Sequence, residues 1–449
     1  MDHGMDFYKD IVNVTCEELL GIMNVSLAQQ AKDVVKSIMG RSVRTKDPLF
    51  WPAGTELLGL LSAATYMKRL SEKKSKEDSS ASDYYDNIKV RCLFAISAHL
   101  DMWLKDYEGK IDFVDDALSG YCFVKLYEET LEDKYKEAAD RIARFILTAP
   151  RDDQGSIIYN PGRNCANIFA DGIGQVSMFM AAYMSAFPDS DIAISSGSRL
   201  DASKQIKNFF EMGVDKKSGL NYHGYSLADN QKKGLLGWGR AFGWLFMGVA
   251  ETAVAAVNST TESEDAKCSE DCPEKKRCFM NSAFNITGLY RQMCQTALEY
   301  QRSDGGWSWQ IQGVEGHIDM SATGMIAYSI ARGYNAGLIS DDLTENFNKM
   351  RECMLSHTSG GKVIDALSSC DDFGVHYQTY GHFPWGQGMV LAALSEITGL
   401  YLPEAISSSR YSSSFFKPCW FSSRSESAVI SVTSASISGA FKAKHTAII

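Results

Sequence analysis

The chain has 449 residues, of which 45% are hydrophobic and 11% aromatic, enough for a globular protein with a sizeable core. Its formal net charge of −10, without a basic stripe, argues against nucleic acid or an anionic membrane surface as a partner. The 11 cysteines are odd in number and widely spread, which is not the pattern of a disulfide scaffold.

The N-terminal segment, residues 1–6, lacks the charged-then-apolar pattern of a signal peptide. We therefore expect a cytoplasmic protein by default, and a secreted one if the N-terminus of the sequence is incomplete. No uninterrupted apolar run is long enough to span a bilayer, so no membrane partner is expected.

Apolar spacing predicts helices almost throughout, because alternating strand patterns are absent before the C-terminal tail. Residues 55–70 are apolar on nearly all sides, whereas residues 133–147 carry one apolar stripe opposite a charged face. An inner apolar helix followed by an outer two-faced one recurs along the chain. The expected helices span residues 26–39, 54–70, 84–104, 115–130, 133–147, 170–187, 201–213, 237–257, 281–301, 320–337, 340–356 and 384–398.

These helices form six hairpins, which predicts an all-α fold, the (α/α)6 barrel. The N-terminal ends of the inner helices would ring a central cavity, a favourable place for a ligand. We expect residues 26–402 to form this catalytic domain, 1–25 an N-terminal extension and 403–449 a Ser-rich disordered tail. Residues 258–280, acidic and polar, are expected to be an insertion between helices.

Three cysteines of that insertion, Cys268, Cys272 and Cys278, cluster with a spacing that matches no common zinc site. No nucleotide-binding, metalloprotease or serine-hydrolase motif is present either. The sequence therefore predicts neither a metal nor a cofactor.

Residues 237–244 open a strongly apolar helix with two indoles and one guanidinium. The N–H groups of Trp238 and Trp244 need partners, and Arg240 is too polar to bury without an acceptor. Flat indole faces suit sugar rings, and a guanidinium suits a carboxylate. The structural alternative is a packed helix start in which the glycines allow close approach.

Three aspartates start expected helices: Asp115 and Asp116 one of them, Asp171 another. Each could simply cap a helix, because the helix dipole favours negative charge in the first turn. Each could instead face the cavity as an acid–base group. The flanks of Asp171 are unusually apolar, which favours its proton-bearing form.

Further aromatic and imidazole groups occur near these helix starts. His223 lies shortly before the indole-bearing segment, and Trp385 opens the last inner helix. Trp307 and Trp309 lie on an expected loop, where large aromatics indicate binding more often than core packing. Carboxylates, aromatics, an arginine and a histidine together suit carbohydrate chemistry, in which two carboxyl groups commonly share the work.

The order of these motifs resembles that of the unsaturated glucuronyl and rhamnogalacturonyl hydrolases, glycoside hydrolase families 88 and 105. The resemblance runs through most of residues 50–400. The segments that carry it are Trp51-Pro52-Ala53-Gly54-Thr55, Asp115-Asp116 with Gly120, Ala170-Asp171-Gly172, His223-Gly224-Tyr225, Trp238-Gly239-Arg240 with Gly243-Trp244, Ser321-Ala322-Thr323 and Pro384-Trp385-Gly386-Gln387-Gly388.

The resemblance implies an (α/α)6 barrel that releases a 4,5-unsaturated uronic acid from the non-reducing end of lyase-generated oligosaccharides, with pectin or rhamnogalacturonan fragments favoured. Members hydrate the C4=C5 vinyl ether: a proton goes to C4, water adds at C5, and the hemiketal collapses and releases the next sugar. The implied partner is the oligosaccharide; no cofactor or metal is implied, and nothing indicates the oligomeric state.

By this resemblance Asp171 is the general acid/base, and Asp116, ahead of Asp115, assists by positioning substrate or water. The indoles would stack on the sugar, while His223 and Arg240 would hydrogen-bond the uronate. The implied substrate-binding residues are His223, Trp238, Arg240, Trp244, Trp51 and Trp385.

The chain departs from the family pattern in three places. Many relatives carry Trp where Phe169 stands and a histidine where Ala166 stands, and the segment between His223 and Trp238 is short. Two alternatives therefore stay open. One is a six-hairpin glycosidase of another specificity that cleaves directly with a carboxylate pair, and the other is an inactive carbohydrate-binding relative.

Overall fold

The computed structural model describes residues 3–22, 48–74, 79–159, 166–265, 284–369 and 378–399. The expected helix at 26–39, the clustered cysteines of the insertion and the tail from 403 lie outside these ranges. Met1–Ser412 form one compact unit, and the second unit, Ser413–Ile449, lies outside the described residues.

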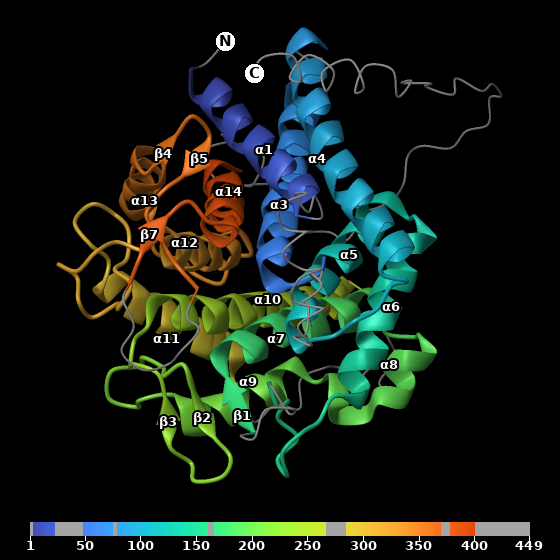
Figure 1. The fold of residues 1–449 in the computed structure, drawn as a ribbon, viewed down its shortest axis with the longest axis vertical. Helices are drawn as coiled ribbons and strands as arrows, with labels where there is room; N and C mark the ends of the chain where they lie inside the picture. Colours follow the sequence, from blue (N-terminus) through green and yellow to red (C-terminus); the bar gives the residue numbers. More distant parts are fainter. Residues whose placement is uncertain are drawn as a thin grey trace, which may run out of the picture. The chain divides into compact units, whose positions relative to one another are not determined.

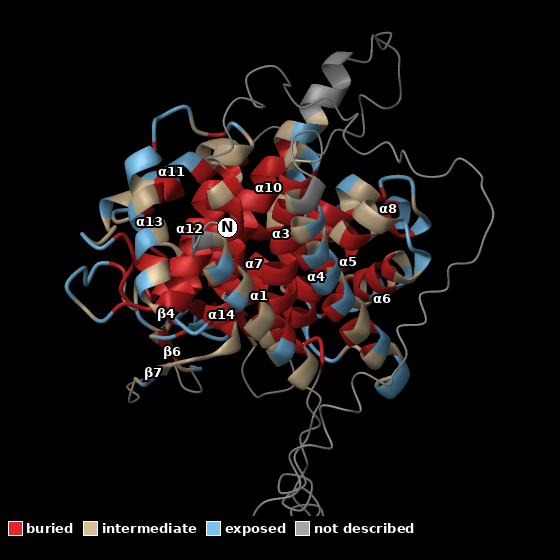
Figure 2. Cartoon of the chain, turned by 90° about the horizontal axis from the view of Figure 1, so that it is seen from above, coloured by how far each residue is buried: buried red, intermediate tan, exposed pale blue. Residues whose placement is uncertain are grey.

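A closed inner ring of six helices, each packed on the next, forms the centre of the described part of the chain (Figure 1). These helices are apolar on most sides, so they can be buried almost all round, as the red inner segments of Figure 2 show. The ring consists of α3 (Trp51–Lys74), α5 (Ala117–Thr130), α7 (Ala170–Ala186), α10 (Gly239–Asp265), α12 (Met320–Asn335) and α14 (Pro384–Gly399), which returns to α3.

An outer helix precedes each inner one in the chain, and this alternation confirms the (α/α)6 barrel. The apolar stripe predicted for α6 is confirmed, because Tyr135, Ala138 and Ile142 are buried. The outer helices are α1 (His3–Gly21), α4 (Ser79–Asp106), α6 (Asp133–Thr148), α9 (Ala202–Gly213), α11 (Ile286–Glu299) and α13 (Thr344–Ser356); α8 (Asp191–Ser196), η1 (Val114–Asp116) and η2 (Gly197–Leu200) are short.

Short strands in the segments between the helices pair with one another. Strands β1, β2 and β3 form one antiparallel sheet, β4 pairs with β5, and β6 pairs with β7. Their bounds are β1 Asn167–Phe169, β2 Gly224–Ser226, β3 Lys232–Lys233, β4 Thr358–Ser359, β5 Lys362–Val363, β6 Ala366–Leu367 and β7 Tyr380–Gly381.

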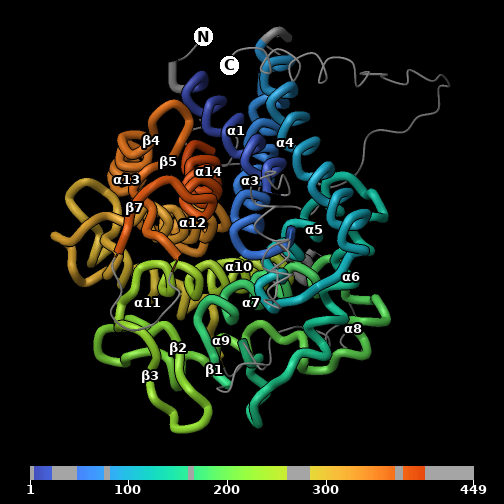
Figure 3. The backbone as a smooth tube through the Cα atoms, viewed as in Figure 1, coloured from blue at the N-terminus to red at the C-terminus, as the bar shows by residue number. Residues whose placement is uncertain are grey.

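The structure has a helix, α1, before residue 26, where the sequence pattern predicts an extension without a helix. Instead α1 packs against α3, α4 and α14, so the first and last helices lie side by side (Figure 3). The side chains of Ile11 and Leu19 are fully buried. Gln387 of α14, also buried, donates to the carbonyl of Ile11 and to Thr15 Oγ1. The sequence missed α1 because these polar contacts join segments more than 370 positions apart.

Helix α10 runs on to Asp265 instead of ending at 257, so the first residues of the expected insertion are helical. Its stretch Gly239–Ser259 is, among the described residues, the one helix long and apolar enough to cross a membrane. However, 83% of that stretch is buried inside the protein, as its position in the inner ring requires.

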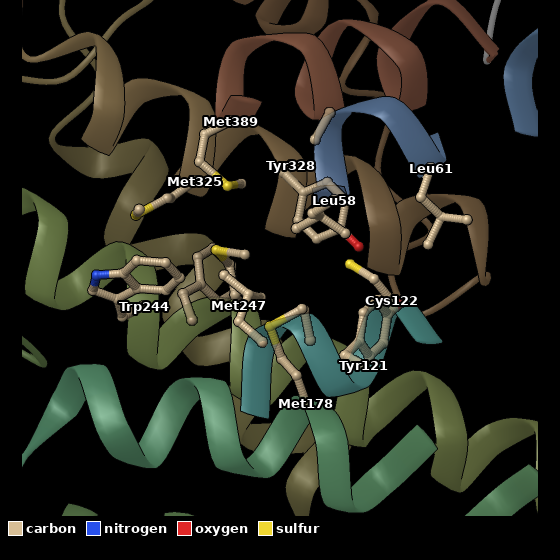
Figure 4. Packing of buried hydrophobic residues seen from close by; sticks show 14 of the residues in the cluster. Leu58, Leu61, Tyr121, Cys122, Met178, Trp244, Met247, Met325, Tyr328 and Met389 are labelled. Atoms are coloured by element: carbon tan, nitrogen blue, oxygen red, sulfur yellow. The ribbon is translucent and has the colours of Figure 1, made fainter. Parts of the chain in front are cut away.

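Methionines from four inner helices fill the middle of the ring (Figure 4). Met178, Met247, Met325 and Met389 are all fully buried, and their unbranched side chains fill irregular space well. Further along the axis, the buried Glu251 of α10 accepts from Tyr328 Oη at 2.7 Å and pairs with Arg332 of α12 at 2.9 Å.

A buried acid, Glu56 of α3, lies against Glu18 of α1. Burial first, and then Glu18, raise the pKa of Glu56 well above its usual value. The two carboxyl groups can share a hydrogen bond only while one of them carries a proton. On its other side Glu18 hydrogen-bonds His382, and this bond raises the pKa of the imidazole. Together these groups fasten α1 to the ring.

Glu56→Gln is expected to weaken the pH dependence of stability. Because folding raises the pKa of Glu56, its stabilising contribution is complete below the unfolded value of about 4.3 and is lost as the pH rises. Glutamine keeps a donor for Glu18 and does not ionise. The Tm of the variant, followed by circular dichroism, should therefore fall less between pH 5 and 8 than that of the wild type. The control is Glu128→Gln, which removes a partly exposed partner of Lys125; parallel curves for wild type and Glu56→Gln would contradict the assignment.

Candidate active site

Asp171 and His223 meet at the start of α7. Strand β1 leads into this helix and pairs with β2, so Phe169 lies opposite Gly224, and the N–H of Ala170 donates to the carbonyl of His223. This register places His223 Nε2 2.8 Å from Asp171 Oδ2, an ion-pair distance without an aligned hydrogen bond on that oxygen. The Asp171 side chain is 15% exposed, so it lies mostly buried yet open to a ligand.

The two aspartates of η1 point to different partners. Asp116, fully buried, accepts from the backbone N–H groups of Asp112 and Phe113 through Oδ2, at 3.1 and 3.3 Å. Asp115 is directed to the first turn of α7, where its Oδ2 accepts from Tyr159 Oη at 2.5 Å. Asp116 therefore holds nearby backbone, whereas Asp115 contacts Tyr159, whose ring lies against Gly172 of α7.

Tyr159 is a member of this group that the sequence does not indicate. Its ring packs edge-on against Phe169, with the centroids 5.3 Å apart, and Phe169 in turn contacts His223 at 5.0 Å. The ring also covers Gly172, because a Cβ added there would lie 2.8 Å from Tyr159 Cδ2. No periodicity or motif marks Tyr159, since its contacts depend on the fold alone.

Four indoles come together from three helix starts. Trp238 contacts the imidazole of His223, with ring centroids 4.3 Å apart. Trp51 of α3 lies 4.8 Å from Trp385 of α14 and 6.2 Å from Trp244 of α10. Trp51 is half-buried and Trp244 is buried, so Trp51 presents the more accessible face.

Arg240 binds backbone carbonyls in the structure. Its Nη1 donates to the carbonyl of Leu367 and its Nη2 to that of Ser368, both at 2.9 Å. The guanidinium, 2% exposed, also lies over the rings of Trp238 and Trp385, at 4.7 and 5.7 Å. These contacts place the guanidinium between two indoles, and its hydrogen bond to the uronate stays a prediction.

Strand β6 supplies the acceptors of this arrangement. The carbonyl of Leu367 also accepts from Trp385 Nε1 at 2.8 Å, and the N–H of Leu367 donates to Asp319 Oδ1 at 3.0 Å. Asp319, the N-cap of α12, additionally accepts from Ser321. These contacts join Ser321 and Trp385, from two of the motif segments, to the same strand.

The two tryptophans of the expected binding loop, Trp307 and Trp309, differ in burial. Trp307 is fully buried and donates to the carbonyl of Ala297, so the prediction of a binding role for it is wrong. Trp309 is half-buried, and its carbonyl accepts from Gly239, which holds the loop against the start of α10. Across the described ranges, no group of three or more His, Cys, Asp or Glu side chains is placed to hold a metal ion.

The sequence matches the family described as Glycosyl Hydrolase Family 88 over residues 27–401. The chain belongs to glycosyl hydrolase family 88. Membership makes the protein a glycosidase and agrees with a site built of carboxyl groups and indoles. No curated protein sequence matches this member of the family.

Solved structures similar to this family 88 protein share its fold at low sequence identity. A possible member of family 105 from Klebsiella pneumoniae is 15% identical, with a TM-score of 0.61 over 88% of this chain and 93% of its own. A family 105 glycoside hydrolase from C. acetobutylicum is 18% identical, with a TM-score of 0.55 over 82% and 98%. An unsaturated glucuronyl hydrolase specific for heparin is 13% identical, with a TM-score of 0.55 over 88% and 98%.

Arg240→Lys is expected to lower the free energy of unfolding by roughly 2 kcal/mol, because two buried carbonyls lose charged donors in a fixed fork. The control is Arg291→Lys, which removes a single donor to the carbonyl of Leu338 at an exposed position. Urea unfolding of both variants measures the difference. Equal losses would argue against a special role for the fork at position 240.

Proposed function

We propose that this family 88 protein releases a 4,5-unsaturated uronic acid from the non-reducing end of lyase-generated oligosaccharides, of the rhamnogalacturonan type. The observation that carries the proposal is the pairing of Asp171 with His223, whose ring contacts Trp238. The likeness to an unsaturated glucuronyl hydrolase and to two structures from family 105 supports the reaction on an unsaturated uronic acid.

Asp171 acts as the proton donor in this proposal. It delivers a proton to C4 of the vinyl ether, and positive charge then develops at C5 and the ring oxygen. The resulting carboxylate takes a proton from the water that adds at C5, which restores the acid. The hemiketal then opens, and the next sugar leaves with the hydrogen that balances the added water.

Asp115 acts as the charged partner. A carboxylate near the developing positive charge stabilises it, and two carboxyl groups in different surroundings can hold different protonation states. His223 keeps Asp171 in place through the 2.8 Å contact, and Trp238 flanks the imidazole. The indoles of Trp51, Trp244 and Trp385 offer apolar faces for the sugar.

Asp171→Asn is expected to abolish the reaction. The wild type should bleach the ultraviolet absorbance of the conjugated double bond in lyase-treated rhamnogalacturonan fragments, and the variant should lose at least about 100-fold in kcat. Asp201→Asn is the matched control, since Asp201 caps α9 without contacting this site. Bleaching of glycosaminoglycan fragments alone would correct the substrate class. Cleavage of a saturated analogue at a similar rate would instead support direct hydrolysis by a carboxylate pair.

Variants of the adjacent residues Asp115 and Asp116 should behave differently in the same assay. Asp115→Asn is expected to lower kcat by about 100-fold or more, because it removes the negative charge that stabilises the developing positive charge in the proposed reaction. Asp116→Asn should instead lower stability by about 1 kcal/mol, because it weakens two backbone hydrogen bonds, and leave kcat within a few-fold. The reverse pattern would restore Asp116 as the assisting residue.

A further inference from the structure

We infer that Tyr159 is a positioning residue that fixes the carboxylate of Asp115 against the first turn of α7. The inference rests on the proposed function, in which Asp115 must be charged while Asp171 carries a proton. No motif marks Tyr159, and its place follows from four contacts of the described residues.

The hydroxyl group of Tyr159 provides the first contact. It donates to Asp115 Oδ2 at 2.5 Å, within the range of short hydrogen bonds to a carboxylate. Asp115 is only 3% exposed, so water competes little for that oxygen. A donor to the charged form of a carboxyl group stabilises that form relative to the protonated one.

The ring of Tyr159 is held from two sides, which fixes the direction of its hydroxyl group. Edge-on packing against Phe169 holds one side, and the lack of a side chain at Gly172 makes room on the other. The backbone N–H of Tyr159 donates to the carbonyl of Asn167 at 3.0 Å, which ties its segment to β1.

These contacts link the two acids through a series of neighbouring rings. Tyr159 packs edge-on against Phe169, Phe169 contacts His223 at a tilt, and His223 contacts Asp171. A shift of Tyr159 would therefore disturb both ends of this series. The arrangement holds one acid by a donated hydrogen bond and the other by an imidazole, which suits two different protonation states.

The same hairpin contains a matched pair for comparison. Tyr183 of α7 donates to Asp140 of α6 at 2.6 Å, with the same chemistry as the pair of Tyr159 and Asp115. Tyr183 lies in the last turns of α7, away from the helix start that carries Asp171. Its removal tests what the loss of any such hydrogen bond does.

The test is the pH profile of kcat/KM for Tyr159→Phe, measured by double-bond bleaching. Phenylalanine keeps the ring contacts and removes only the hydroxyl group. We expect kcat to fall about tenfold or more, with KM within about twofold. The acidic limb of the profile should move to higher pH, because Asp115 loses the donor that favours its charge. Tyr183→Phe should leave the profile unchanged.

The double variant Tyr159→Phe with Asp115→Asn completes the test. If Tyr159 acts through Asp115, its change should cost little further activity once the carboxylate is gone. The inference would be overturned if the fold-losses in activity of the two single changes multiplied in the double variant. It would also be overturned if the acidic limb of Tyr159→Phe stayed at the wild-type pH.

A second measurement does not depend on turnover. Because the donor favours the charged Asp115, the stability lost in Tyr159→Phe should be larger at pH 7 than near pH 3.5. If the wild type bleaches no unsaturated substrate, the proposed function fails, and this stability difference still decides the positioning role. An equal loss at both pH values would reject that role.

Discussion

The contact that closes the inner ring, between α3 and α14, is the constraint on which the site depends. A Cβ added at Gly388 would overlap the carbonyl of Thr55, so the two backbones touch without side chains between them. Because both helices begin at the same end of the ring, this contact brings Trp51 and Trp385 to 4.8 Å from positions more than 330 residues apart. Helix α1 then covers the outside of the junction, fastened through Gln387.

The site itself combines acids from two adjacent inner hairpins with indoles from three helix starts. Rings separate the charged groups from one another: Phe169 lies between Tyr159 and His223, and Arg240 lies over two indoles. Several polar groups reach a partner through a short strand. Leu367 of β6 shows this best, since one backbone carbonyl accepts from both Arg240 and Trp385.

Much of the fold and part of the site could be predicted from periodicity and motif order. Apolar spacing predicted all six inner helices, because a helix buried on every side has apolar residues on all its faces. The aspartates, His223 and the indoles are candidates because their residue types imply chemistry. The hydrogen bonds of Arg240 to two backbone carbonyls could not be predicted, because every residue has a carbonyl group and the sequence does not mark which one lies nearby. The sequence does not decide between Asp115 and Asp116, because the direction of each side chain depends on the turn η1.

The methionine-filled interior of the barrel determines how a polymer can approach. Met178, Met247, Met325 and Met389 are fully buried, and Figure 4 shows them in the same region of the ring as Trp244. Because these side chains fill the ring, an oligosaccharide held at the indole-bearing helix starts enters and leaves by one face. The proposed release of a uronic acid from a chain end requires no passage through the barrel.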